Sequence, residues 1–205
     1  MLTNTHVLIA AAALTRRRYT RRQNLLIVFG GFFPDLSLFV MFVVGRMPGS
    51  QITNLWRKPD GMYWQEPWQF LSALSNSFPI YIAALLIFLL LLRSAPKSRV
   101  VWLSLVLFVL AGLTHILVDF MTHADDAHVQ FWPFSGARFN SPISYWQSQY
   151  YGKWVGAFEL LMGAGLVTIL WRRFASWQPR VGVALLGLPY LASVAFTLAG
   201  FGHQI

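Results

Sequence analysis

Histidine and acidic residues gather in one short stretch of this sequence, LTHILVDFMTHADDAH. His115, Asp119 and His123 recur every fourth residue, so on an α-helix their side chains lie one above the other. Imidazole and carboxylate groups at this spacing have Cβ atoms about 5–6 Å apart and can share one cation. Such ligands suit zinc first, and also manganese or iron. The stretch therefore predicts a divalent metal site, and it places Asp126 on the same face if the helix continues. The alternative is a polar helix end that caps itself and binds lipid headgroups.

Three further ionisable residues lie in or beside apolar stretches, where a charge costs a few kcal/mol or more. Asp35 follows Pro34 in a segment that proline and glycine allow to bend, and its alternative role is to cap the half-helix after Pro34. Glu159 lies in VGAFELLMGAG, where a carboxylate must meet a cation or be protonated. His6 stands close to the start of the sequence. These three residues are candidate further members of the site formed by His115, Asp119 and His123.

The elements that hold these residues must be membrane helices. Of the 205 residues, 56% are hydrophobic and only 11% are charged, whereas about 25% are charged in a soluble domain. The sequence therefore predicts an all-α, polytopic transmembrane helical bundle with about five or six membrane segments, in a single domain over residues 1–205. There is no cysteine, which excludes thiolate ligands and disulfides.

Five apolar segments are clear, and a sixth is only half a span long. The five are Asn24–Gly45, Ser77–Leu92, Val100–Met121, Val155–Trp171 and Val181–Gly202. The sixth, His6–Leu14, is either a short tilted helix or a helix that lies in the membrane interface.

The basic residues orient these segments. Eleven of the sixteen Lys and Arg residues lie in three clusters, Arg16–Arg22, Arg93–Arg99 and Arg172–Arg180, which we expect on the cytoplasmic side of a bacterial inner membrane. The formal net charge of +9 comes largely from these clusters. They leave no contiguous basic face for phosphates, so we expect no nucleic-acid partner.

Depth arithmetic indicates which candidates can meet. His115 lies about 22 Å along its helix from the cytoplasmic side, which leaves it about 8 Å below the opposite boundary of a core about 30 Å thick. Glu159 lies at a similar depth. Asp35 lies near the midplane and needs a broken or tilted helix to reach the others. His6 joins them only if the N-terminus is periplasmic.

Two longer connections, about residues 46–76 and 122–153, then face the periplasm and are rich in aromatic residues. The second is either part of an aromatic belt at the membrane interface or a rim above the site. In the second case Arg138 is placed to bind a substrate phosphate.

Several short motifs resemble the membrane-bound metal-dependent hydrolases, a YdjM-like bacterial group whose founder is a LexA-regulated inner-membrane protein. The shared pattern is Thr5-His6, then Gly30-x-x-x-Pro34-Asp35, then His115-x-x-x-Asp119, followed by Trp132-Pro133-Phe134. The group usually carries a histidine near the third segment, where this sequence has Asn76. The order of candidate ligands is also similar, distantly, to that of zinc-dependent phospholipase C.

The resemblance and the residues together predict a metal-dependent hydrolase of a lipid or membrane-associated ester or phosphoester, with its site near the periplasmic boundary. The expected metal ligands are His6, Asp35, His115, Asp119 and His123. Asp126 or Glu159 is the expected catalytic base and Arg138 the expected substrate-binding residue. Membrane lipids are the expected partners. The alternative is a non-catalytic membrane accessory subunit or assembly factor, with a membrane protein partner, that keeps the hydrolase-like fold.

Overall fold

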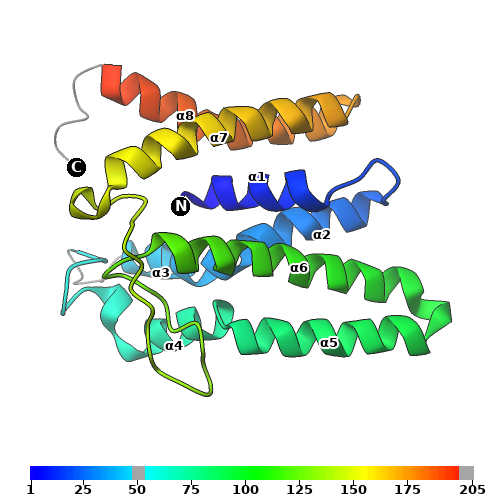
Figure 1. Ribbon diagram of the computed structural model, residues 1–205, viewed down its shortest axis with the longest axis horizontal. Coiled ribbons are helices and arrows are strands. Elements are labelled where there is room, and N and C mark those ends of the chain that lie inside the picture. Colours follow the sequence, from blue (N-terminus) through cyan, green and yellow to red (C-terminus); the bar gives the residue numbers. More distant parts are fainter. Residues whose placement is uncertain (48–53, 199–205) are drawn as a thin grey trace.

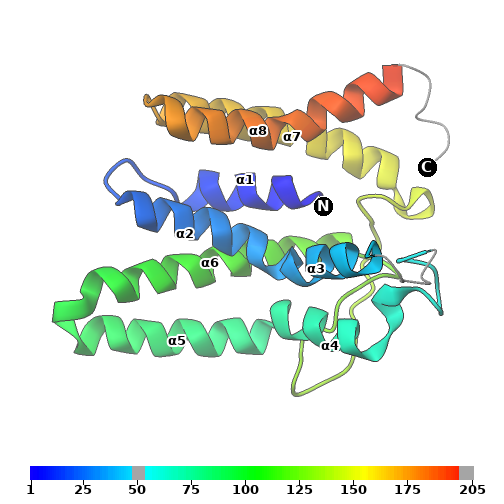
Figure 2. The same ribbon diagram turned by 180° about the vertical axis from the view of Figure 1, so that it is seen from behind.

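The structure is a computed structural model that describes residues 1–47 and 54–198 (Figures 1 and 2). Its α-helices are α1 (Thr3–Leu14), α2 (Arg21–Phe32), α3 (Leu36–Gly45), α4 (Glu66–Ser75), α5 (Phe78–Ser94), α6 (Arg99–Thr122), α7 (Gly152–Arg173) and α8 (Trp177–Leu198). Short 3-10 turns lie at Phe33–Asp35, Met62–Trp64, Pro96–Ser98 and Ser148–Tyr150. No strand occurs in the two described ranges. The predicted all-α fold is confirmed.

Four stretches of the described chain are long and apolar enough to cross a membrane. They are Arg21–Gly45, Glu66–Ser94, Arg99–Thr122 and Gly152–Arg173. The fifth predicted span, Val181–Gly202, overlaps α8 and runs on into residues outside those described. The predicted count of about five or six segments is thus roughly met.

The short first helix lies inside the bundle. Helix α1 packs against α2, α6, α7 and α8, and Thr5, His6, Leu8 and Ala10 on it are almost wholly buried. Of the two possibilities for His6–Leu14, a short helix within the bundle agrees with this packing better than a helix in the membrane interface. Because α1 is central, His6 lies among the long helices.

The predicted span at Asn24–Gly45 is broken in its middle. Helix α2 ends at Phe32, and a 3-10 turn over Phe33–Asp35 leads into α3. The carbonyl of Pro34 at this break accepts hydrogen bonds from Ser75 Oγ at 2.9 Å and Asn76 Nδ2 at 3.3 Å. The end of α4 therefore supports the break, which lies where the proline predicts it.

Two adjacent glycines bring three helices together beside this break. A Cβ atom on Gly30 would lie 2.3 Å from the backbone oxygen of Phe108 in α6. One on Gly31 would lie 3.2 Å from Cα of Val7 in α1. Only glycine lets α2 pack this closely on both neighbours, so the sequence sets the short distance between α1 and α6 across which the candidate site forms.

The three basic connections lie at one end of the bundle. In Figure 1 the turns α1–α2, α5–α6 and α7–α8 all lie on the right, and the connections α3–α4 and α6–α7 lie on the left. Two of the basic turns are linked, because Arg17 donates to the carbonyl oxygens of Arg172 and Arg173. This arrangement agrees with the sorting of basic clusters to one side of a membrane.

Candidate metal centre

Four imidazole groups converge on the carboxylate of Asp119 in the interior of the bundle. Oδ1 of Asp119 lies 2.9 Å from Nε2 of His6 and 3.3 Å from Nε2 of His123. Oδ2 lies 3.0 Å from Nε2 of His115 and 3.8 Å from Nε2 of His128. All five side chains are buried. The ligand atoms fall into two groups, His6–His115–Asp119 and Asp119–His123–His128, with the atoms of each group within 4.8 Å of one another.

Three elements bring these residues together. Helix α1 carries His6 and helix α6 carries His115 and Asp119, while His123 caps the end of α6 and His128 follows in the connection to α7. The rings of His6 and His115 stack, with centroids 3.7 Å apart and planes 13° apart. The stack is possible because α1 and α6 pack closely, so the first group depends on how those two helices meet.

A polar atom lies close to the second nitrogen of three of the imidazoles. Nδ1 of His115 lies 2.7 Å from the carbonyl oxygen of Gly31 and so carries the proton that it donates. Nδ1 of His123 lies 3.0 Å from Oδ2 of Asp126, and Nδ1 of His128 lies 2.8 Å from Oγ of Ser72. Histidines that bind metals almost always have such a partner, which fixes the ring and leaves the other nitrogen free to ligate.

Several atoms that face the centre lack a hydrogen bond within the described chain. They are Oδ1 of Asp119, Nε2 of His128 and both ring nitrogens of His6. His6 Nε2 is close to Asp119 Oδ1, but the two are not aligned for a hydrogen bond. Each unsatisfied buried group costs about 1–3 kcal/mol. A cation among them would satisfy several at once, so this donor set fits a zinc-type metal ion.

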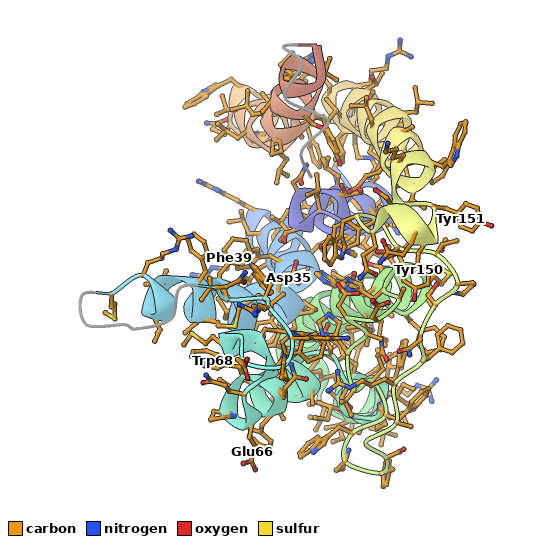
Figure 3. All side chains as sticks on the ribbon, turned by 90° about the vertical axis from the view of Figure 1, so that its left-hand side faces the viewer. Asp35, Phe39, Glu66, Trp68, Tyr150 and Tyr151 are labelled. Atoms are coloured by element: carbon orange, nitrogen blue, oxygen red, sulfur yellow. The ribbon has the colours of Figure 1, made fainter. Side chains whose placement is uncertain are left out.

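Asp35 reaches the centre from the break between α2 and α3. Its Oδ1 lies 3.5 Å from Nε2 of His115, and its Oδ2 accepts a hydrogen bond from Thr3 Oγ1 at 2.5 Å. Figure 3 shows Asp35 among the helices, whereas the labelled Glu66 and Tyr151 lie at the periphery. The break supplies the departure from a straight helix that Asp35 needs in order to meet His115.

Asp126 does not continue the helical stripe. Helix α6 ends at Thr122 because its last carbonyls bond to the following connection: Ser141 Oγ donates to Met121 O and Tyr145 N to Thr122 O. The chain turns there, and Asp126 lies behind His123, where its Oδ2 also accepts a hydrogen bond from Trp146 Nε1 at 2.9 Å.

Burial and charge set the ionisation of the groups just outside the membrane segment. Burial and the nearby charge of His123 lower the pKa of His128 to about 4, so its imidazole is neutral at neutral pH. Burial opposes the charge on His123, but the Asp119 carboxylate outweighs it and raises the His123 pKa to about 9. Burial likewise opposes ionisation of Asp126, but the hydrogen bond from His123 and its charge lower the Asp126 pKa to about 2.

Glu159 belongs to α7, and its side chain contacts the N-terminal end of α1. Its Oε1 accepts hydrogen bonds from Leu2 N, at 2.8 Å, and from Thr5 Oγ1. The Thr5 hydroxyl also lies 2.6 Å from the hydroxyl of Tyr190. A carboxylate is favourable at a helix N-terminus, and these contacts hold the helix that carries His6. Glu159 belongs to neither group of ligand atoms, and its role as catalytic base stays a prediction.

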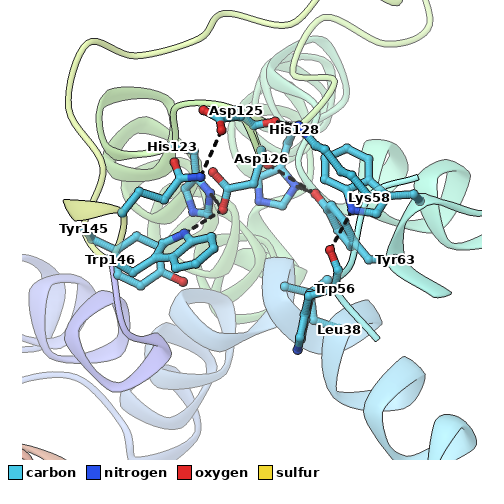
Figure 4. Close-up of a pocket in the computed structure, with 12 residues that line it drawn as sticks. Leu38, Trp56, Lys58, Tyr63, His123, Asp125, Asp126, His128, Tyr145 and Trp146 are labelled. Carbon is cyan, nitrogen blue, oxygen red and sulfur yellow. Dashed lines mark hydrogen bonds and ion pairs between the residues drawn. The ribbon is translucent and has the colours of Figure 1, made fainter. Parts of the chain in front are cut away.

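A pocket of about 500 Å³ borders the second group of ligands (Figure 4). It is lined by Leu38, Trp56, Lys58, Tyr63, Trp64, His123, Asp125, Asp126, His128, Tyr145, Trp146 and Gln147. Figure 4 shows His123, His128 and Asp126 facing the same space as Lys58 and Trp146. The pocket therefore gives access to the His123–His128 side of the centre.

Arg138 is not among the residues that line this pocket. Its guanidinium donates to Ala127 O at 2.5 Å and to Gln69 Oε1 at 2.6 Å, so it holds the connection instead. Lys58 does line the pocket, and its Nζ lies 2.6 Å from Asp125 O and 4.4 Å from the ring centroid of Trp64. The substrate role of Arg138 stays a prediction, and Lys58 is a second candidate.

Sequence reasoning missed His128 and Lys58. His128 is five residues after His123, so it falls off a stripe that repeats every fourth residue. Its only signal was its place in the same polar stretch. Lys58 lies in a different connection, and nothing in the sequence links the two.

These features define an all-helical integral membrane protein with a buried histidine–aspartate centre at one end of its bundle. The sequence model of the YdjM inner membrane protein family matches residues 1–203, so the chain belongs to that family. No similar protein was found among curated proteins, and no solved structure matched. The family match agrees with a location in the inner membrane, while hydrolase activity and the likeness to zinc-dependent phospholipase C stay predictions.

Proposed function

We propose that this protein is a membrane-embedded metal-dependent hydrolase that acts on a lipid phosphoester. One observation supports this most: four imidazole Nε2 atoms converge on one buried carboxylate, and two of the rings, those of His115 and His128, make a hydrogen bond through the second nitrogen. A structural ion pair needs one histidine for one carboxylate. Four around one carboxylate supports a metal centre, because imidazole and carboxylate are common metal ligands.

The ligands on this proposal are the two groups that share Asp119. His6 and His115 are the donors on one side, with Asp35 beside His115, and His123 and His128 are the donors on the other side. A divalent metal bound there supplies a water of lowered pKa and polarises the ester oxygens. Zinc is the first candidate, because imidazole and carboxylate are its usual ligands in a site without cysteine.

Asp126 is better placed than Glu159 to act on the attacking water. Its side chain lines the pocket, it is ionised at neutral pH, and its Oδ1 lacks a hydrogen-bond partner within the described residues. It would accept a hydrogen bond from the water and orient it. Hydrolysis joins the water oxygen to phosphorus, breaks the bond to the alcohol oxygen, and returns a proton to that alcohol.

The pocket suggests how the substrate is held. Lys58 supplies a positive charge beside Trp64, and the indoles of Trp56 and Trp146 are about half exposed at the same opening. Indole rings favour the membrane–water boundary. We therefore place the phosphate of a lipid headgroup near Lys58, with its chains toward the membrane.

The test is hydrolysis of phospholipid in vesicles by the detergent-purified, reconstituted protein. We expect release of headgroup or phosphate that stops on chelation and returns with zinc, manganese or iron. Lys58→Ala should raise KM with little change in kcat, and Lys153→Ala, which removes an exposed lysine that does not line the pocket, should change neither. Absence of hydrolysis from every phosphoester offered, by protein that holds its metal, would favour the accessory-subunit alternative.

A further inference from the structure

A second pocket lies at the opposite end of the bundle from the metal centre. It has a volume of about 470 Å³, within the range of about 300–1,000 Å³ that is usual for small-molecule sites. Helix α2 forms one wall, through Leu25 and Val28, and α8 forms another, through Val183 and Leu186. Ala11 near the end of α1 also lines it. We call this pocket the basal groove.

The basal groove changes from apolar to polar toward the connections. Leu25, Val28 and Leu186 lie along its helices, whereas Arg21, Asn24 and Gln178 lie in the first turns of α2 and α8. Arg21 is exposed, and no hydrogen bond or ion pair of its guanidinium occurs within the described chain. The basal groove thus combines apolar walls with the guanidinium of Arg21, which is unpaired within the described residues.

The charge around this mouth is unbalanced. Eight arginines lie in the α1–α2 and α7–α8 connections and the adjoining helix ends, from Arg16 to Arg22 and from Arg172 to Arg180. None of the seven acidic residues of the chain lies in these stretches. Several of these arginines cap helix ends, since Arg173 donates to Ala11 O and Thr15 O, and Arg180 to Phe174 O. Capping keeps them in place and leaves their positive charge uncompensated.

We infer that the basal groove binds an anionic phospholipid, with an acyl chain between α2 and α8 and the phosphate near Arg21. The apolar walls match a hydrocarbon chain, and the uncompensated arginines match a negative headgroup. Basic pockets between membrane helices bind acidic lipids in this way. A water-soluble anion would gain nothing from the leucine and valine walls, and a neutral lipid would gain nothing from the arginines.

The groove is separate from the proposed active site. The residues that line the groove and those of the metal centre do not overlap. Ala11, which lines the groove, is five positions from His6 along α1, which corresponds to roughly 8 Å of helix. Lipid binding here therefore does not depend on the hydrolase proposal, and it can be measured on protein without activity.

The experiment is native mass spectrometry of the full-length protein released from detergent after exchange into phosphatidylglycerol, phosphatidylcholine or glycerophosphate. We expect retention of phosphatidylglycerol, little phosphatidylcholine and no glycerophosphate. Arg21→Gln should lower phosphatidylglycerol affinity about fivefold, since one basic residue near an anionic headgroup contributes about that much. Arg93→Gln is the matched control, because Arg93 lies at the end of α5 and does not line the groove.

A second pair of variants tests the acyl-chain part. Gly182 lines the groove, and a Cβ atom there would meet nothing within 4 Å, so the position has room for a side chain. We expect the ring of Gly182→Phe to occupy the groove. Gly165→Phe places the same ring at an equally open position on α7 outside the groove. We expect only Gly182→Phe to abolish retention of the lipid. Equal retention of both lipids, or unchanged phosphatidylglycerol binding in Gly182→Phe or Arg21→Gln, would overturn the inference.

Discussion

Asp119 presents both of its carboxylate oxygens to imidazole nitrogens, which either protonated histidines or a metal ion can stabilise. The contacts of His115 help to distinguish protonated histidines from a metal ion. Its Nδ1 donates to Gly31 O, so a neutral ring would direct a lone pair from Nε2 toward Asp119 Oδ2 at only 3.0 Å. That contact requires a second proton on His115 or a cation shared with Asp119. The presence of three more imidazoles around the same carboxylate favours the shared cation.

The first prediction concerns His128, which was not among the ligands expected from the sequence. His128→Ala removes a donor that helical spacing does not reveal but that the structure places 3.8 Å from Asp119 Oδ2. We expect metal occupancy to fall at least as far as in His123→Ala, since both belong to the same group. Asp60→Asn, a change to an exposed acidic residue, should leave the occupancy unchanged. Full metal occupancy in His128→Ala would remove this residue from the centre.

The second prediction separates two roles of Glu159. Both of its hydrogen bonds end on Oε1, which glutamine retains, so a residue that only positions α1 tolerates Glu159→Gln. We expect this variant to keep its melting temperature and its metal. Glu159→Leu leaves the buried Thr5 hydroxyl without this acceptor, which costs about 1–3 kcal/mol, and also removes the acceptor of Leu2 N. It should lower both the melting temperature and the metal content. The catalytic role predicted from sequence requires instead that Glu159→Gln lose hydrolysis by an order of magnitude with its metal retained.

At the scale of elements, the site depends on how closely α1, α2 and α6 approach. The third prediction is that Gly31→Val separates α1 from α2, because the new Cβ would lie 2.9 Å from Cβ of Ala10. Overpacking of this kind costs about 1–3 kcal/mol, and it displaces His6 as well. We expect a lower midpoint of thermal unfolding and reduced metal content. Gly156→Val is the control, since a Cβ there meets nothing within 4 Å. Wild-type metal content in Gly31→Val would show that the centre does not need this packing.

Composition and periodicity predict the long helices and the His115–Asp119 pair, because both depend on residues that are neighbours along one helix. The proline break also follows from local chemistry at Pro34. The other features depend on contacts between residues far apart in the sequence. Helix α4, which begins at Glu66-Pro67, was missed although proline in a first helical turn is a common signal. The turn after Thr122, which removes Asp126 from the stripe, is set by hydrogen bonds from residues about 20 positions later.

At the scale of the whole molecule, eleven of the sixteen basic residues lie away from the candidate metal centre. The three basic connections share one end of the bundle, and the histidine–aspartate centre lies toward the other. The fourth prediction follows from the excess of Lys and Arg residues in the cytoplasmic loops of membrane proteins. Reporter fusions after Ser94 and after Ala175 should report cytoplasm, and a fusion near Gln147 should report periplasm. A cytoplasmic signal at Gln147 would reverse the side on which the pocket opens.

The central claim is that the residues around Asp119 hold a metal ion, and elemental analysis of gently purified protein tests it most directly. We predict at least one zinc, manganese or iron per chain, retained through size exclusion in detergent. Asp119→Asn, which removes the charge shared by both groups of ligands, should lose nearly all of it and remain folded by circular dichroism. A metal-free wild-type protein, or a folded Asp119→Asn variant with undiminished metal, would contradict the account.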